Sequence, residues 1–342
     1  MELKSLFINK SFFKKNNLSV KTQENYFIDN FNKSYLNEGY GFFLQSLKSV
    51  SNVKLAIGVR DALNILKSQN FHIVVIDLKA IIESIKKSEL LLTFLKERNN
   101  KVILYCSYDG NFSKSTNINN ICNYMNISAI YVTNLLKDFS EYHINKNFLH
   151  KLKPTYLGLG KTNISYNHKK HFFDLDLMAP ISSKKYDAFF IGSVNKKKRL
   201  RSSFLDQIRT DTRVQNYKIY VEKYNKNDSH SIFNNINMIK SSTLSIDLSG
   251  QIDNLSMRFH EILLFDGIPL TDKGFLKFHL SNMYSEIINY ITFNDMNQFF
   301  YLIKIYQSNN FRNFILKKIS KIFSGYYDPF RHGNLIIKDL NL

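Results

Sequence analysis

Residues 72–78 read His-Ile-Val-Val-Ile-Asp-Leu, and this run decides the fold class. A strand that is apolar on both faces is typical of a parallel sheet that helices cover on both sides. Similar short runs occur at 3–8, 53–57, 101–105 and 129–132, and residues with helical apolar spacing separate them. This alternation predicts a βαβ-type parallel sheet in the first part of the chain.

A polar segment, residues 161–185, interrupts the alternation; it contains Pro180 and ends in Ser-Ser-Lys-Lys. The alternation restarts at 186–191 (Tyr-Asp-Ala-Phe-Phe-Ile), and further strands are expected at 217–221, 244–246 and 268–270. We therefore expect an α/β protein with two Rossmann-like domains that face each other across a cleft. The expected boundaries are 1–165 for the first domain, 166–185 for a linker and 186–342 for the second domain.

The composition excludes several classes of protein. Apolar residues make up 44% and aromatic residues 14% of the 342 residues, which excludes a chain that is disordered by composition. The two cysteines, Cys106 and Cys122, exclude a disulfide scaffold and a four-cysteine zinc site. No uncharged apolar run reaches about 18 residues, and lysines interrupt the apolar residues at the N-terminus. We expect no membrane span and no signal peptide, and hence a cytoplasmic protein.

The charge is strongly positive. Lys and Arg number 47 and Asp and Glu number 28, so the formal net charge is +19. Such a charge favours anionic partners: nucleic acid, anionic lipid or phosphorylated substrates. A lysine-rich composition without any such partner is the alternative, and both interpretations stay open.

The strand expected at 186–191 runs into Gly192-Ser193 and then into a basic cluster that contains Arg199 and Arg201. A strand that leads through Gly-Ser into a helix start leaves backbone N–H groups free, and these favour a phosphate. The two arginines would add charge-assisted hydrogen bonds. The alternative is an ordinary strand–helix turn with a solvated basic helix start.

A second motif lies at 253–270, DNLSMRFHEILLFDGIPL, and predicts an amphipathic helix that Gly267 ends as a C-cap glycine. Arg258 and Glu261 lie three residues apart on one flank, off the apolar stripe. They form either a surface ion pair or a ligand site. In a ligand site Arg258 would meet a phosphate or sugar, and Glu261 would accept hydrogen bonds from ribose hydroxyls.

Other ligand motifs are incomplete. Residues 155–162 lack the first glycine of a phosphate-binding P-loop, and Gly39-Tyr40-Gly41 lacks the third glycine of a dinucleotide fingerprint. No pair of histidines has metal-ligand spacing together with a nearby carboxylate or cysteine. We therefore expect neither a metal nor a cofactor.

The two surviving motifs resemble those of GT-B-fold glycosyltransferases, most of all the group 1 and CgeB-like members. Arg258-Phe-His-Glu261 followed by Gly267-Ile-Pro269 resembles their R-x-x-E…G-x-P helix, and residues 186–193 with Arg199 or Arg201 resemble the D-x-x-F-x-G…R opening of their donor domain. One departure is that Asp253 stands where the first glutamate of the family's E-x7-E pair would be. The histidine between Arg258 and Glu261 is not typical either.

The resemblance implies a metal-independent enzyme that moves a sugar from a nucleotide-sugar donor to a glycan or lipid-linked acceptor. It implies donor-binding roles for six residues: Gly192, Ser193, Arg199, Arg201, Arg258 and Glu261. Asp109 or Glu38 would be the general base, and Gly39, Tyr40 and Gly41 would form a loop on the acceptor side. The alternative role for Asp109 is to cap a turn before Gly110. The last helices, about 309–323, would pack back on the first domain.

Two other classes stay open. A basic nucleic-acid-binding protein would use the charge of +19 together with the 20 tyrosines and 29 phenylalanines. Against it, no nucleic-acid-binding motif occurs, and many aromatics lie inside apolar runs, so we expect no nucleic-acid partner. A GT-B-like scaffold without catalysis is the other class. For the enzyme, the positive charge is compatible with contact to an anionic membrane at its inner face.

Overall fold

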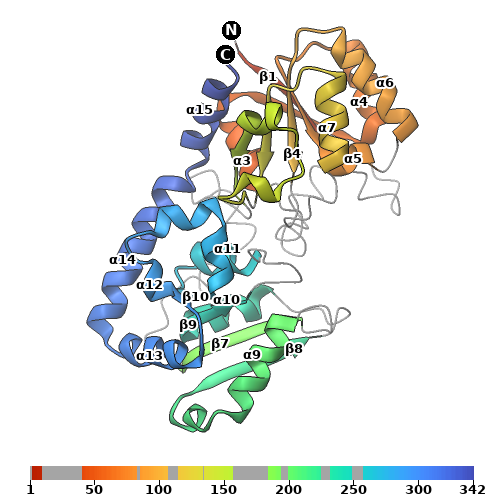
Figure 1. Cartoon of the computed structure of the whole chain (residues 1–342). Helices are drawn as coiled ribbons and strands as arrows, with labels where there is room; N and C mark the ends of the chain where they lie inside the picture. The colour runs from red at the N-terminus through yellow and green to blue at the C-terminus, as the bar shows by residue number, and fades with distance from the viewer. Residues whose placement is uncertain are drawn as a thin grey trace. The chain divides into compact units, whose positions relative to one another are not determined.

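The computed structural model describes residues 2–9, 41–82, 85–106, 115–133, 135–156, 184–193, 199–224, 232–248 and 257–342. These residues form two compact units, each with its own sheet (Figure 1). The first unit holds the described residues in 2–156 and 328–342, and the second holds those in 184–327. The α/β class expected from the sequence is confirmed. The linker expected at 166–185 is described only at its last two residues.

The first unit contains a six-stranded parallel sheet in the order β2-β1-β3-β4-β5-β6. Its strands are β1 Lys4–Asn9, β2 Asn52–Ile57, β3 Ile73–Asp77, β4 Lys101–Cys106, β5 Ala129–Val132 and β6 Leu152–Pro154. Its helices are α3 Gly41–Val50, α4 Gly58–Ser68, α5 Leu78–Ile82, α6 Ile85–Lys96, α7 Ser115–Tyr124 and α15 Pro329–Asp339, with short 3-10 helices at Phe139–Glu141 and Lys146–Lys151.

The second unit contains a five-stranded parallel sheet in the order β11-β10-β9-β7-β8. Its strands are β7 Tyr186–Ser193, β8 Ile219–Tyr224, β9 Ser242–Asp247, β10 Pro269–Asp272 and β11 Thr292–Phe293. Its helices are α9 Arg199–Thr210, α10 Ile232–Ser241, α11 Met257–Leu264, α12 Ile288–Ile291, α13 Met296–Tyr306 and α14 Asn309–Tyr326, with 3-10 helices at Thr212–Asn216, Lys273–Lys277 and His279–Tyr284.

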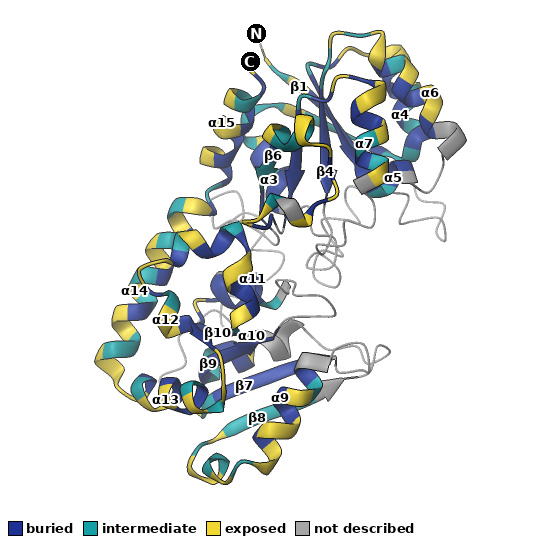
Figure 2. Cartoon of the chain, viewed as in Figure 1, coloured by how far each residue is buried: buried dark blue, intermediate teal, exposed yellow. Residues whose placement is uncertain are grey.

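The central strands are buried on both faces, as the uninterrupted apolar runs predict. Every residue of β3 is buried, and so is every residue of β9 (Figure 2). Such burial requires that every backbone N–H and C=O finds a partner within the sheet, which parallel neighbours on both sides provide. The strand expected at 72–78 is therefore confirmed as β3.

The two sheets share one topology. In each, the first strand pairs with the second at one edge, and the chain then crosses to the other side of the first strand. The direction of winding therefore reverses between β1 and β3 in the first sheet, and between β7 and β9 in the second. In open parallel sheets, ligands bind outside the carboxyl ends of the strands at this reversal point.

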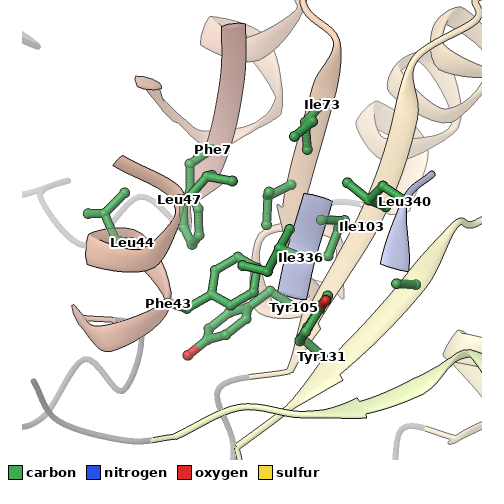
Figure 3. Packing of buried hydrophobic residues seen from close by; sticks show 12 residues of the cluster. Phe7, Phe43, Leu44, Leu47, Ile73, Ile103, Tyr105, Tyr131, Ile336 and Leu340 are labelled. Atoms are coloured by element: carbon green, nitrogen blue, oxygen red, sulfur yellow. The ribbon is translucent and has the colours of Figure 1, made fainter. Parts of the chain in front are cut away.

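Aromatic and aliphatic side chains pack together in the core of the first unit (Figure 3). The ring of Phe43 on α3 lies 4.8 Å from that of Tyr105 on β4 and 5.0 Å from that of Tyr131 on β5, centroid to centroid. Ile336 and Leu340, at the end of the chain, complete this cluster. The last helix thus supplies part of the core of a sheet that begins at residue 4.

Helix α15 packs closely against α3. A Cβ atom on Gly333 would lie only 2.4 Å from the carbonyl oxygen of Ser46, so this position requires a residue without a side chain. The Tyr131 hydroxyl also donates to Asp339 Oδ2 at 2.8 Å, and Lys153 Nζ lies 3.5 Å from Asp339 Oδ1. Packing and polar contacts therefore both hold α15 in the first unit, whereas the preceding α14 belongs to the second.

No helix among the described residues combines the length and the apolar composition that crossing a bilayer requires.

Candidate functional site

The candidate site lies at the reversal point of the second sheet, where β7 and β9 separate. The last β7–β9 pair in the described strands joins Phe189 to Ser245, whereas the pairing of β7 with β8 continues to Ser193. Gly192 and Ser193, both predicted site residues, therefore occupy the carboxyl end of β7 on the side where β9 has left it. This is the position at which a parallel sheet of this topology receives a ligand.

Arg258 reaches this strand end from helix α11. A Cβ atom on Gly192 would lie 3.1 Å from Arg258 Nη1 and 2.8 Å from Phe190 Cζ. The guanidinium carbon of Arg258 lies 5.4 Å from the centroid of the Phe190 ring, within the range of a cation–π contact. The missing side chain at Gly192 therefore leaves the space that the arginine occupies. The two motifs identified in the sequence meet at this point.

Glu261 lies one turn after Arg258 on the same helix and is buried, with 9% of its surface exposed. Burial raises the pKa of Glu261 above its usual value, and the positive charge of Arg258 opposes that rise. An exposed ion pair, the alternative considered from the sequence, does not fit a buried carboxylate. Because an unpaired buried charge is costly, this carboxylate needs hydrogen-bond donors.

Arg201 is buried and supports the end of β9. Its Nε and Nη2 atoms donate to the carbonyl oxygen of Leu248, the residue after β9, at 3.0 and 2.8 Å. This forked contact fixes the backbone on one side of the reversal point. The sequence predicted Arg201 as a ligand-binding cation. In the structure its guanidinium binds the backbone that follows β9, and its charge adds positive potential at the reversal point.

His260 joins the site helix to the end of α14. Its Nδ1 atom lies 2.7 Å from the hydroxyl oxygen of Tyr327 in a hydrogen bond between two buried side chains. Burial lowers the pKa of His260 to about 3, so the ring is neutral at pH 7. The other ring nitrogen, Nε2, has no hydrogen-bond partner among the residues that the structure describes. Nothing in the sequence indicated the contact with Tyr327, because the two residues are 67 positions apart.

Gly267 ends α11 as the sequence predicts, because its N–H donates to the carbonyl oxygen of Ile262 at 2.8 Å. The left-handed residue of this helix end is Asp266, with φ of 59°. Gly267 also provides space, because a Cβ atom there would lie 2.7 Å from Ile239 of α10 and 2.7 Å from Ile262. The glycine thus allows α11 to approach α10, and the turn residue is the aspartate before it.

Several predicted residues lie outside the described part of the chain: Glu38, Gly39, Tyr40, Asp109 and, in the second motif, residues 253–256. Gly41 is the first residue of α3, and Arg199 is the first residue of α9. Asp109 follows β4, which is one strand away from the reversal point of the first sheet. Asp77 ends β3, which does border that point; it is buried and accepts a hydrogen bond from the Lys79 N–H at 3.0 Å.

The described ranges contain no cluster of three or more His, Cys, Asp or Glu side chains that could hold a metal ion. Among the described residues, the charged side chains at or next to the reversal point of the second sheet include those of Arg201, Arg258 and Glu261, and that of Asp247, the buried last residue of β9.

No family model and no curated protein matches this chain. Two solved structures match over nearly the whole length. One, described as a glycosyltransferase from Rickettsia africae ESF-5, is 11% identical with a TM-score of 0.50, and the match covers 99% of each chain. The other, described as the glycotransferase of kitacinnamycin, is 6% identical with a TM-score of 0.48, and the match covers 99% of this chain and 100% of that one. The chain thus has a mixed α/β fold with two parallel sheets, of the two-domain GT-B-like type found in glycosyltransferases.

Proposed function

We propose that the chain is a glycosyltransferase that moves a sugar from a nucleotide-sugar donor to a hydroxyl group of a glycan or a lipid-linked acceptor. The observation that carries this proposal is the position of Arg258, which lies beside Gly192 at the reversal point of the second sheet and interacts through its charge with the buried Glu261. Arg258 provides a cation and Glu261 a buried carboxylate. Gly192 has no side chain, so a ligand can approach the backbone at the end of β7.

Each residue has a role in this proposal. The backbone at Gly192 and Ser193 and the guanidinium of Arg258 bind the donor diphosphate, with Arg199 as an additional cation. Glu261 accepts hydrogen bonds from the ribose hydroxyls, which supply the donors that its buried carboxylate needs. Arg201 holds the strand end through Leu248.

In the reaction, the bond between the anomeric carbon and the diphosphate oxygen breaks, and a bond forms to the acceptor oxygen. Negative charge develops on the leaving diphosphate, and fixed cations and N–H groups that stabilise such charge are usually the largest catalytic contribution. We propose that Arg258 supplies this stabilisation in place of a metal ion. For an inverting reaction, Asp109 or Glu38 remains the proposed base that takes the acceptor proton.

Thermal-shift measurements with nucleoside diphosphates, nucleotide-sugars and oligonucleotides test the proposal. We expect one nucleotide family to raise the melting temperature of the wild type, and Arg258→Gln and Glu261→Gln to reduce that rise. The matched control is the double variant Asp206→Asn, Arg209→Gln. These two residues form an exposed pair on α9 with the same three-residue spacing, and Arg209 Nη1 lies 3.9 Å from Asp206 Oδ1. A shift with oligonucleotides alone would favour the nucleic-acid-binding class, and no shift with any nucleotide would favour the non-catalytic scaffold.

A further inference from the structure

Helix α14 has one face in the core and one face in solvent. Ile315, Ile319 and Phe323 are buried, which accounts for the inward face. On the opposite side Phe314, Lys317, Ser320, Lys321 and Ser324 are exposed at helical spacing (Figure 2). We refer to Phe314, Lys317 and Lys321 as the α14 stripe.

The chain around this stripe carries positive charge without acidic residues. Between Asp295 and Asp328 the sequence contains five basic residues and no Asp or Glu; the basic residues are Lys304, Arg312, Lys317, Lys318 and Lys321. Both flanking aspartates are helix caps. Asp295 accepts from the Gln298 N–H at 2.8 Å, and Asp328 accepts from the Phe330 N–H at 2.9 Å. Both carboxylates are therefore already bound to backbone N–H groups at helix N-termini.

One carboxylate from another element approaches the helix. Glu286 Oε2 lies 2.7 Å from Lys318 Nζ, and the hydrogen bond from Lys318, together with the positive charges of Lys318 and Lys321, lowers the pKa of Glu286. Within the described residues, Lys317 and Lys321 have no carboxylate within 4.0 Å. The stripe thus keeps two lysines available for an external anion.

An exposed phenylalanine, Phe314, lies about one helical turn before Lys317 on the same helix. The side chain of Phe314 is 52% exposed, and Lys318 Nζ is 5.9 Å from its ring centroid. On the preceding helix α13, Tyr301 is 60% exposed. An exposed phenylalanine beside lysines on one helix matches the surface of an anionic bilayer, where the ring enters the interface and the ammonium groups reach lipid phosphates.

We propose that the α14 stripe binds the headgroup surface of a phospholipid bilayer that contains anionic lipids. Nucleic acid presents phosphates as well, but it is bound by several aromatic platforms along a basic groove. The stripe has one apolar ring and compact ammonium charges on a single helix, which fits a flat surface better. This inference does not require that the chain transfers sugars, although it fits an acceptor that is anchored in lipid.

Vesicle co-sedimentation of the full chain tests the proposal. We expect the wild type to bind vesicles of phosphatidylcholine with about one third phosphatidylglycerol, and to bind pure phosphatidylcholine vesicles weakly. The triple variant Phe314→Ser, Lys317→Glu, Lys321→Glu should reduce binding to the anionic vesicles at least about tenfold, because it removes the apolar anchor and reverses two charges.

The matched control is Leu90→Ser, Lys67→Glu, Lys146→Glu, which likewise removes one exposed apolar side chain and reverses two lysine charges, at exposed positions of the first unit. It should bind anionic vesicles within about twofold of the wild type, and unchanged thermal melts would show that both variants fold. If the control loses as much binding as the α14 variant, general charge rather than the stripe binds lipid, and the proposal is wrong. An α14 variant that keeps vesicle binding but loses binding to a single-stranded oligonucleotide would also overturn it.

Discussion

Acidification from pH 7 to pH 5 should destabilise the fold through two buried histidines, His260 in the second unit and His332 in the first. Burial lowers the pKa of His332 from 6.5 to about 4, while a hydrogen bond to the Pro154 carbonyl and the charge of Asp339 oppose that fall. Burial lowers the pKa of His260 from 6.5 to about 3. Both rings are therefore neutral in the folded chain at pH 5, but protonated when the chain unfolds.

The sign follows from proton uptake. Between pH 6.5 and about 4 for His332, or about 3 for His260, the unfolded chain binds a proton that the folded chain does not. The contribution of each neutral ring to the free energy of unfolding is therefore fully present above pH 6.5, and it is lost as the pH falls through that window. Each histidine should cost about 2 kcal/mol between pH 7 and pH 5, at about 1.4 kcal/mol per pH unit well below the unfolded pKa.

Urea unfolding at both pH values, for the wild type and for His332→Phe, measures this effect. The phenylalanine keeps a ring among Phe42, Phe43 and Tyr131 but does not titrate. The free energy of unfolding should therefore fall about 2 kcal/mol less in the variant than in the wild type on acidification. The comparison cancels other groups, including Glu261, whose raised pKa acts with the opposite sign. An equal pH dependence in the two proteins would refute the reasoning.

Three further substitutions follow from the packing and the site. Gly333→Ala should destabilise the fold by about 1–3 kcal/mol, because the added Cβ would meet the Ser46 carbonyl oxygen. Alanine usually stabilises a helix relative to glycine, so a melting temperature that rises in this variant would contradict the prediction. Arg201→Lys keeps the charge but loses the fork to Leu248, and should cost about 1–3 kcal/mol in urea unfolding. Glu261→Gln should weaken binding of the selected nucleotide by about 1–3 kcal/mol in calorimetry, and an unchanged affinity would remove Glu261 from the site.

Elements of the fold could be predicted from the sequence where the local apolar pattern agrees with the packing. The run at 72–78 predicted β3, because a strand buried on both faces needs apolar residues at every position. The restart at 186 predicted β7, and Gly192 and Ser193 at its carboxyl end lie at the reversal point. The predicted helix around Arg258 and Glu261 is confirmed as α11, while their role in ligand binding stays a prediction.

Contacts between distant segments could not be predicted in this way. The hydrogen bond between His260 and Tyr327 joins residues 67 positions apart, and the one between Tyr131 and Asp339 joins residues 208 positions apart. No local pattern encodes such pairs. The role of Gly333 was missed for the same reason, since its small size matters only against α3. Gly267 was correctly predicted to end α11, but its close approach to Ile239 of α10 was not, because that contact depends on another helix.

Hydrogen–deuterium exchange with and without the nucleotide that gives the largest thermal shift locates the ligand most directly. If the ligand binds at the reversal point of the second sheet, backbone amides at 190–193 and 257–261 should exchange more slowly when it is present. Arg258→Gln should abolish that protection at the same nucleotide concentration. Protection confined to the first unit, or a thermal shift with unchanged exchange in both segments, would contradict the assignment of the site.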